Sequence, residues 1–262
     1  MDLTTTPGFV AGFRTELGLR ELGGWKSADG RVVRHGLLYR GSALTGLNSK
    51  ERRLVNKLGL RFILDLRAPG EVTGREDYVP AGAEYVRIGG MYIDDGTEVD
   101  FSPAGIARIM GRIQADQEHF LDDLYVGMMF GNPAVHALVD RLVHGTAPLY
   151  FHCTAGKDRT GVCAAVLLSL LGVPDDAILE EYLLTNIYRA SIINMRPEEL
   201  PEGISQLDRD NWARFNSVDA AQLKAALDAV DKRFGTREDY FRDEFGLDAA
   251  ALESLRSRYL EK

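Results

Sequence analysis

Cysteine and positive charge are both scarce in this sequence. Only two cysteines, Cys153 and Cys163, occur in 262 residues, which is too few for a disulfide framework and fits a reducing compartment. Acidic residues outnumber basic ones by 39 to 31, and the net charge of −8 disfavours broad attraction to nucleic acid or anionic membranes. We therefore expect no nucleic-acid partner, and any bound anion must be held locally.

Long apolar runs, targeting signals and metal-ligand spacings are missing as well. The longest apolar-rich stretch, residues 162–173, is far shorter than the roughly 20 residues that span a bilayer. Residues 1–12 contain no basic region followed by an apolar stretch and a small-residue cleavage site. The five histidines show no spacing such as His-Glu-x-x-His. The sequence predicts no integral membrane association, no metal and no cofactor, and either a cytoplasmic location or export without a recognisable signal peptide.

Short apolar or alternating runs that suit β-strands are interleaved with segments of helical periodicity. Strands are predicted at 61–67, 84–88 and 148–152, and helices at 49–58, 134–144, 160–171 and 174–188. This alternation predicts an α/β fold with a central, mostly parallel sheet flanked by helices. No linker or repeat divides the chain, so one domain is expected over residues 1–262.

The C-terminal third is predicted to be helical. Ser217, Thr236 and Asp248 are each placed to cap the start of a helix. Before them, the periodicity weakens over residues 187–216, a stretch that contains Pro197, Pro201 and Gly203. We expect an active-site lid there, with a plain surface excursion as the alternative.

The segment from His152 to Gly161 carries the most chemistry. Cys153 stands six positions before Arg159, after a predicted strand and before a predicted helix. The intervening loop is long enough to wrap one phosphate, with backbone N–H groups of residues 154–159 turned inward and the positive end of the helix behind them. The residues predicted to bind phosphate are Thr154, Ala155, Gly156, Lys157, Asp158 and Arg159.

Each side chain of this segment has an expected task. Cys153 is the candidate nucleophile, because a cysteine at a helix N-terminus and beside a cation is deprotonated more easily. The planar guanidinium of Arg159 matches two phosphoryl oxygens. Thr160 can donate to the Cys153 sulfur, and His152 is expected to support the thiolate or the loop backbone. Cys163 is expected to be a core residue, and a buried structural cysteine remains the alternative for Cys153.

This segment resembles the signature of the protein tyrosine phosphatase superfamily. Four more segments are similar, in the same order, to markers of the bacterial atypical tyrosine/lipid phosphatases, which include secreted phosphatases of mycobacteria and Listeria. These segments are Arg20–Trp25, Leu37–Ser42, Leu64–Arg67 and Glu181–Asn186. The resemblance spans roughly residues 18–260 and implies the phosphatase α/β fold. The chain departs from the family at Gly41, where an Arg-Ser pair is more usual, and over residues 187–216.

Aspartates in three segments compete for the role of general acid, which must protonate the leaving oxygen, and the pair Asp94-Asp95 is expected to be only a turn. Asp158 ranks first, because it lies inside the loop and its Asp-Arg-Thr context resembles that of phosphoinositide phosphatases. Asp65 ranks second, because it ends a strand expected beside the signature strand, although a structural ion pair with Arg67 is an equal alternative. Lys157 resembles the lysine of lipid phosphatases and is expected either to contact a second anionic group or to be solvated. Arg189 is expected on a solvated face.

Together these features predict a metal-independent phosphomonoesterase that works through a phosphocysteine. The expected substrates are phosphotyrosine proteins, with phosphoinositides as a second class, and the product is inorganic phosphate. Two alternatives stay open at this point. The same loop would serve a catalytically silent module that binds phosphorylated partners, or a rhodanese-like sulfurtransferase, whose loop also combines a cysteine with backbone amides.

Overall fold

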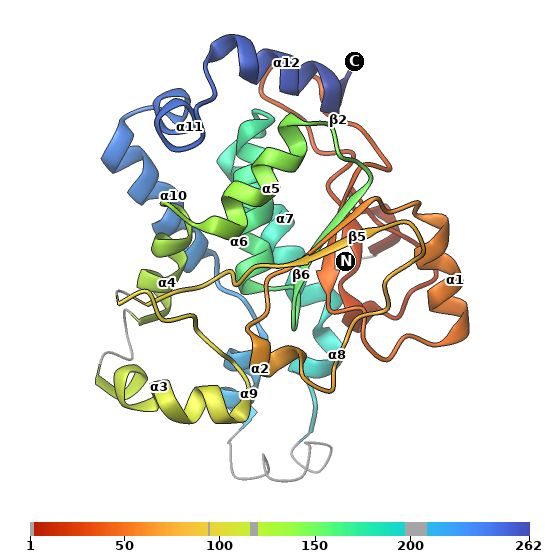
Figure 1. Cartoon of the computed structure of the whole chain (residues 1–262), viewed down its shortest axis with the longest axis vertical. Helices are drawn as coiled ribbons and strands as arrows, with labels where there is room; N and C mark the ends of the chain where they lie inside the picture. The colour runs from red at the N-terminus through yellow and green to blue at the C-terminus, as the bar shows by residue number, and fades with distance from the viewer. Residues whose placement is uncertain (1–2, 94, 116–119, 197–208) are drawn as a thin grey trace.

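The fold is built on a five-stranded central sheet, seen in a computed structural model that describes residues 3–93, 95–115, 120–196 and 209–262 (Figure 1). In spatial order the strands are β1 (Arg20–Glu21), β3 (Leu38–Ser42), β6 (Leu149–Cys153), β4 (Phe62–Asp65) and β5 (Glu84–Arg87). The last four run parallel, and β1 is antiparallel to β3. The predicted α/β class with a mostly parallel sheet is confirmed.

Successive side chains of a strand point to opposite faces of the sheet, and they belong to two hydrophobic clusters, one on each face. In β4, Phe62 and Leu64 belong to the larger cluster and Ile63 to the smaller. The smaller cluster also contains Val55 of α1 (Ser49–Lys57), and the larger one takes in α6 (Asp158–Leu170). Helices therefore cover both faces, as Figure 1 shows for α1 and α6.

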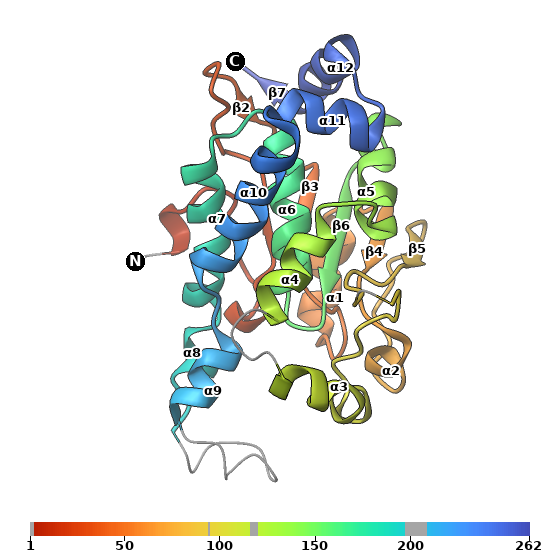
Figure 2. The same cartoon turned by 90° about the vertical axis from the view of Figure 1, so that its left-hand side faces the viewer.

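The remaining helices pack around α6 and its neighbours or lie at the two ends of the sheet. They are α2 (Pro69–Val72), α3 (Pro103–Ala115), α4 (Phe120–Met128), α5 (Pro133–Val143), α7 (Asp175–Tyr188), α8 (Ala190–Ile193), α9 (Arg209–Asn216), α10 (Ala220–Phe234), α11 (Arg237–Phe245) and α12 (Ala249–Tyr259). In Figure 2, α2, α3, α8 and α9 lie at the lower end, and α11 and α12 lie at the upper end. Short 3₁₀ helices at Leu3–Thr5 and Thr15–Leu17 complete the N-terminal region.

The C-terminal third is helical, as predicted. Thr236 accepts a hydrogen bond from Asp239 N and Asp248 accepts one from Ala251 N, so both predicted caps are confirmed. The predicted cap at Ser217 is wrong, because α10 begins at Ala220 and the Asp219 carboxylate accepts from Ala221 N instead.

A small second sheet fastens the C-terminal end of the chain to the N-terminal region. Strand β7 (Leu260–Glu261) pairs antiparallel with β2 (Val32–Val33). Neither strand was predicted, because a two-residue strand has no periodicity to detect. Within the described parts of the chain, no helix combines the length and the apolarity needed to cross a membrane.

Candidate active site

The predicted phosphate loop lies between β6 and α6. Strand β6 ends at Cys153, and α6 begins at Asp158, two residues before the predicted start at Thr160. The early start places Asp158 and Arg159 on the first helical turn, where a carboxylate is stabilised by the positive end of the helix. Cys153 is 2% exposed and Arg159 is 4% exposed, so the reactive groups lie in a nearly dry setting.

The carbonyl groups of the loop are held outward by donors from elsewhere in the chain. Ala43 N donates to Thr154 O at 3.4 Å, Arg189 Nη1 to Ala155 O at 3.4 Å, and Arg40 Nη2 to Gly156 O at 2.8 Å. Because the N–H of the next residue points opposite to each carbonyl, the amides of residues 155–157 turn to the inner side. This arrangement matches the predicted anion nest.

Arg40, which donates to the loop, belongs to a buried ion cluster. The Glu181 carboxylate accepts from Arg20 Nε at 2.7 Å and from Arg40 Nη1 at 2.6 Å, and Arg20 also donates to Thr185 Oγ1 at 3.0 Å. Arg20, Arg40 and Glu181 are each at most 1% exposed. Three of the family-like segments therefore meet here, and their polar residues fix the backbone of the phosphate loop.

Glycines allow the loop to approach the neighbouring strand closely. Gly156 has a φ of +67°, and a Cβ there would lie 2.3 Å from Gly41 C and 2.6 Å from Ser42 N. At Gly41 a Cβ would lie 2.5 Å from the Tyr150 hydroxyl oxygen. The departure from the family pattern at Gly41 therefore has a steric reason in this chain, since Tyr150 occupies the space of a side chain.

The Cys153 thiol is poised for ionisation. Burial alone raises its pKa, but the charge of Arg159 and the interaction with Thr160 outweigh that effect and hold the pKa below its ordinary value. The Thr160 hydroxyl is buried, and among the described residues none lies in full hydrogen-bond geometry to it. Cys163, by contrast, is 0% exposed in the core, and burial raises its pKa to about 12, as expected of an inert structural cysteine.

Arg159 is held by a glutamate that the sequence did not single out. Glu71, on α2, accepts from Arg159 Nη1 at 2.7 Å and from Nη2 at 2.8 Å, and its Oε1 also accepts from Thr154 Oγ1 at 2.6 Å. Arg159 Nη1 donates to Leu66 O as well. This pairing uses the outer edge of the guanidinium, so the edge formed by Nε and the second N–H of Nη2 remains for a phosphoryl group.

Asp158 and Lys157 are neighbours at the open side of the loop. Asp158 Oδ1 accepts from the Tyr125 hydroxyl at 2.6 Å, and Asp158 Oδ2 lies 3.2 Å from Lys157 Nζ. The lysine also donates to Phe215 O at 2.7 Å and to Ser217 O at 3.3 Å. Lys157 is therefore not a freely solvated side chain, since it links the loop to the segment that joins α9 to α10.

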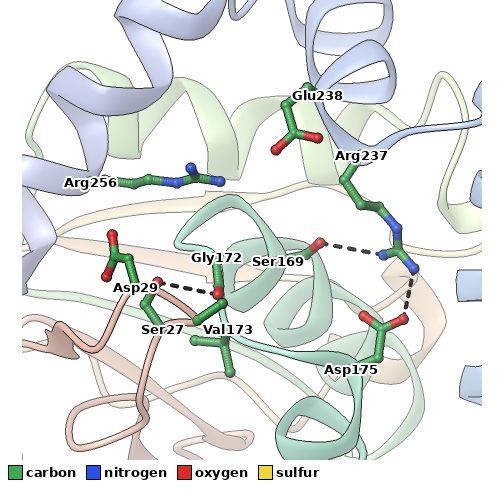
Figure 3. Close-up of a pocket in the computed structure, with 10 residues that line it drawn as sticks. Ser27, Asp29, Ser169, Gly172, Val173, Asp175, Arg237, Glu238 and Arg256 are labelled. Carbon is green, nitrogen blue, oxygen red and sulfur yellow. Dashed lines mark hydrogen bonds and ion pairs between the residues drawn. The ribbon is translucent and has the colours of Figure 1, made fainter.

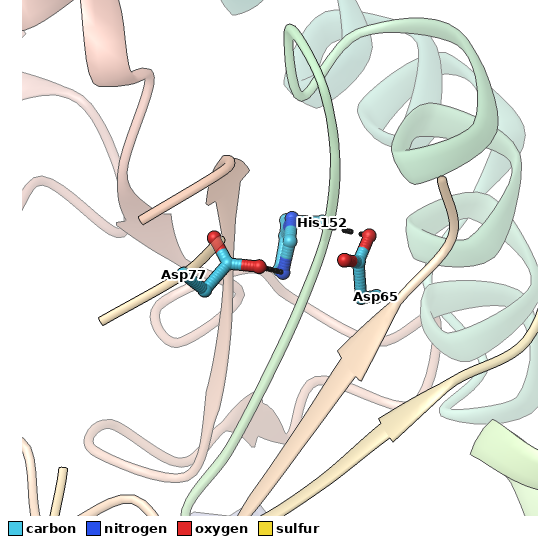
Figure 4. A group of neighbouring side chains, drawn as sticks. All are labelled: Asp65, Asp77 and His152. Carbon is cyan, nitrogen blue, oxygen red and sulfur yellow. Dashed lines mark ion pairs between the residues drawn. The ribbon is translucent and has the colours of Figure 1, made fainter. Parts of the chain in front are cut away.

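Asp65 lies in a buried cluster with His152 and Asp77 (Figure 4). Its carboxylate is 0% exposed and accepts from Arg67 Nε and Nη2 and from the Tyr85 hydroxyl. His152 Nδ1 lies 3.2 Å from Cys153 O, and His152 Nε2 lies 3.3 Å from Asp77 Oδ2. The three residues have the donor types of a metal site, but Arg67 Nη2 pairs with both carboxylates, so the cluster already has its cation.

The charges of this cluster are reflected in its pKa values. Burial lowers the pKa of His152, but the charges of Asp77 and Asp65 more than compensate and leave it raised. Burial raises the pKa of Asp65, but the charge of His152 and the hydrogen bond from Arg67 bring it down to about 2. The His152 ring therefore lies between the Asp77 carboxylate and the Cys153 carbonyl.

Arg189 was predicted on a solvated face, and that prediction is wrong. It is 7% exposed and donates to Asn216 O and Asn216 Oδ1 as well as to Ala155 O, so it joins the phosphate loop to the end of α9. The predicted lid at 187–216 lies partly outside the described residues, which omit 197–208. Of its described aromatics, Trp212 is buried and donates to Ile192 O, whereas Phe215 is 60% exposed.

A cavity of about 310 Å³ lies at the other end of α6 from the loop (Figure 3). Its lining includes Arg237 and Arg256 together with Asp29, Asp175 and Glu238. Arg237 is paired with Asp175 at 2.9 Å and with Asp231 at 2.6 Å, which neutralises its charge. The cavity therefore lacks the surplus of one charge that would mark a site for a phosphorylated ligand.

Comparison with known proteins identifies the family. The sequence pattern of the tyrosine phosphatase family matches residues 16–261. The chain belongs to the tyrosine phosphatase family. It is 31% identical over 248 residues to a protein of Cupriavidus necator whose name assigns it provisionally to the tyrosine-protein phosphatases, covering 95% of this chain and 87% of the relative.

Two other relatives carry phosphatase names. The triple specificity protein phosphatase PtpB of Mycobacterium tuberculosis is 28% identical over 272 residues, covering 92% of this chain and 98% of the relative. A tyrosine-protein phosphatase of Nostoc commune is 26% identical over 219 residues, covering 81% of this chain and 70% of the relative. The predicted family is confirmed, and this tyrosine phosphatase family member is a phosphatase enzyme.

Proposed function

We propose that this phosphatase cleaves phosphomonoesters through a phosphocysteine at Cys153. The thiolate attacks phosphorus and the ester P–O bond breaks, while a carboxyl group gives its proton to the leaving oxygen. Water then attacks phosphorus, the same carboxylate takes a proton from it, and the P–S bond breaks to release inorganic phosphate and the thiolate. Cys153 ends β6 directly before the loop, and Arg159 at the start of α6 lowers the pKa of its thiol; this placement carries the proposal.

Arg159, with the inner amides of Thr154 to Asp158, is proposed to hold the three non-bridging oxygens during both steps. Glu71 fixes the guanidinium from behind, so its free edge is already oriented before a substrate arrives. Thr160 is proposed to donate to the sulfur when the P–S bond breaks. His152 supports the loop through the Cys153 carbonyl.

Asp158 is the proposed acid and base, in preference to Asp65. Asp158 stands on the first turn of α6, and its side chain is 26% exposed. Asp65 is 0% exposed, and both of its oxygens are engaged by Arg67 and Tyr85. We propose that Asp65 instead stabilises the charged His152.

The proposed substrates are phosphotyrosine proteins and phosphoinositides. Lys157 supports the lipid class, because its ammonium lies at the mouth of the loop on two backbone carbonyls that a second phosphate can replace. The relative named as a triple specificity phosphatase supports a broad substrate range. The described parts of the predicted lid, residues 187–196 and 209–216, are proposed to cover the loop in a single domain over 1–262, since Lys157 and Arg189 tie the loop to Phe215, Asn216 and Ser217.

A phosphate-release panel tests the proposal on phosphotyrosine peptides, phosphoserine peptides and phosphoinositide vesicles. Wild type should exceed Cys153→Ser by about 10³-fold or more. Asp158→Asn should lose about 10²- to 10⁴-fold on phosphotyrosine, and Asp65→Asn, the same change in the rival acid, should lose less. If wild type is no faster than Cys153→Ser on every ester, a silent phosphate-binding module is the better reading. Turnover of thiosulfate would instead indicate a sulfurtransferase.

A further inference from the structure

Two buried tyrosine hydroxyls lead to the carboxylate of Asp158. The Tyr125 hydroxyl, on α4, donates to Asp158 Oδ1 at 2.6 Å, and the Tyr182 hydroxyl, on α7, lies 2.6 Å from that of Tyr125. Both tyrosines are 0% exposed, and their rings meet edge to face with centroids 6.4 Å apart. Three helices, α4, α6 and α7, each supply one member of this chain of hydrogen bonds.

The number of protons decides which group donates and which accepts along this series of hydrogen bonds. Each phenol has one proton, and that of Tyr125 is used by Asp158, so Tyr182 is the donor to Tyr125. Burial and the nearby Asp158 charge raise the pKa of both phenols, Tyr125 well above its ordinary value, so both remain protonated donors at neutral pH. Asp158 Oδ1 is therefore an acceptor whenever this series of hydrogen bonds is intact.

The signature glycine makes room for this arrangement. A Cβ on Gly161 would lie 2.6 Å from Tyr182 Cε2 and 2.7 Å from Cδ2, so a side chain there would displace the ring. Burying two hydroxyls costs free energy unless both are hydrogen-bonded, whereas phenylalanines would fill nearly the same volume without that cost. The chemistry proposed so far leaves these two hydroxyls without a task.

We propose that Tyr125, oriented by Tyr182, is a positioning residue that keeps Asp158 Oδ1 as a fixed acceptor, so that Oδ2 carries and delivers the catalytic proton. This inference rests on the proposed role of Asp158 as the general acid. Rotation about the last side-chain torsion of an aspartate is otherwise broad, and either oxygen could face the leaving group. Oδ2 pairs with Lys157 Nζ at 3.2 Å, so this ammonium must turn from Oδ2 to the substrate before Oδ2 carries the proton.

The test uses kcat/KM for two aryl phosphates that differ in how much they need an acid, a phosphotyrosine peptide and dinitrophenyl phosphate. This parameter reports the steps through cleavage of the ester bond and not the later hydrolysis of the phosphocysteine. Tyr125→Phe should lower kcat/KM about tenfold for phosphotyrosine and leave dinitrophenyl phosphate nearly unchanged. Tyr182→Phe should show a smaller loss with the same selectivity, and inhibition by inorganic phosphate should stay at the wild-type value in both.

Tyr240→Phe is the matched control, because Tyr240 is also buried and its hydroxyl donates to Met129 O at 2.7 Å, outside the active site. It should lose a similar amount of thermal stability without changing the ratio of the two kcat/KM values. A Tyr125→Phe enzyme whose ratio also stays at the wild-type value would show that the tyrosines are only structural and would overturn the proposal.

Asp158→Asn separates this inference from the function on which it rests. A selective loss in Asp158→Asn, with none further when Tyr125→Phe is added, is the expected result. If Asp158→Asn is selective and Tyr125→Phe is not, only the positioning role is wrong. If Asp158→Asn itself loses nothing on phosphotyrosine, Asp158 is not the acid and both proposals fall.

Discussion

The Glu71 carboxylate accepts two parallel hydrogen bonds of 2.7 and 2.8 Å from the Arg159 guanidinium. The same carboxylate accepts from Thr154 Oγ1 and from Ala68 N, so it joins the first turn of α2 to the phosphate loop. Burial raises the pKa of Glu71, but its contacts with Arg159 outweigh that effect and keep the group ionised. Arg159, the proposed phosphate-binding arginine, is thus oriented by a residue far from it in the sequence.

Glu71→Gln should damage both stability and activity. The amide retains one acceptor but turns its own donors toward the guanidinium, and breaking a buried ion pair costs about 3–5 kcal/mol. We expect kcat/KM to fall roughly 10- to 100-fold, measured beside the free energy of unfolding in urea. Glu84→Gln is the control, because its pair with Arg141 is at the surface and should contribute about 1 kcal/mol or less. Equal losses in the two variants would contradict the orienting role.

The sequence alone predicted the loop and the central strands well, because those features are local. A strand that ends in His152-Cys153, followed by Gly156 and an apolar helix, is recognisable from periodicity and turn residues. The buried strand β3 was not assigned as a strand, although its residues 38–42 were noted as a family-like segment. All five of its residues are buried, so the alternation that marks a half-exposed strand is absent.

The partners of the loop could not be predicted in the same way. Glu71 and Tyr125 lie on helices and Arg189 lies between α7 and α8, positions where an isolated polar residue is by default a surface residue. Only the fold brings them to the loop, since sequence spacing carries no information on contacts between residues 33 to 88 positions apart. The sequence marks one support of the loop, because Glu181, which accepts from Arg40, lies in a segment that resembles the family.

Gly156→Ala should disrupt the phosphate loop. A Cβ at this position would meet Gly41 O at 2.4 Å, and backbone atoms on a central strand cannot move aside cheaply. We expect at least about a hundredfold loss of kcat/KM together with weaker inhibition by phosphate. Gly59→Ala shares the positive φ but has open space around it, so it should lose only about 1 kcal/mol of stability and keep full activity. A fully active Gly156→Ala would show that the close approach does not matter.

Alkylation should distinguish the two cysteines. The pKa of Cys153 is lowered and that of Cys163 is raised to about 12, so iodoacetamide at neutral pH should modify Cys153 and spare Cys163. Thr160→Val removes an interaction that lowers the Cys153 pKa, and the pH midpoint of alkylation should therefore move upward. Peptide mass spectrometry over a pH series measures both effects. Modification of Cys163 at a comparable rate would contradict the assignment of the nucleophile.

The stability of the fold should decline on the alkaline side through His152. Its pKa is raised above the ordinary 6.5 by the charges of Asp77 and Asp65 against the effect of burial, so its contribution is complete below 6.5 and is lost as the pH rises through the raised value. Asp65 behaves in the opposite sense, because its pKa is lowered from 3.8 to about 2, and its contribution is lost as the pH falls through that range. Urea unfolding across the pH range measures both.

Variants of the cluster assign the alkaline loss. His152→Gln should flatten the stability curve above neutral pH, since no imidazolium remains to be deprotonated. Asp77→Asn removes the carboxylate that raises the pKa of His152 more than Asp65 does, so the loss of stability should begin at lower pH than in wild type. Because His152 faces the Cys153 carbonyl, kcat/KM should decline over the same pH interval as stability in each protein. Curves for wild type and Asp77→Asn that run parallel across the alkaline range would show that His152 is not charged in the folded protein.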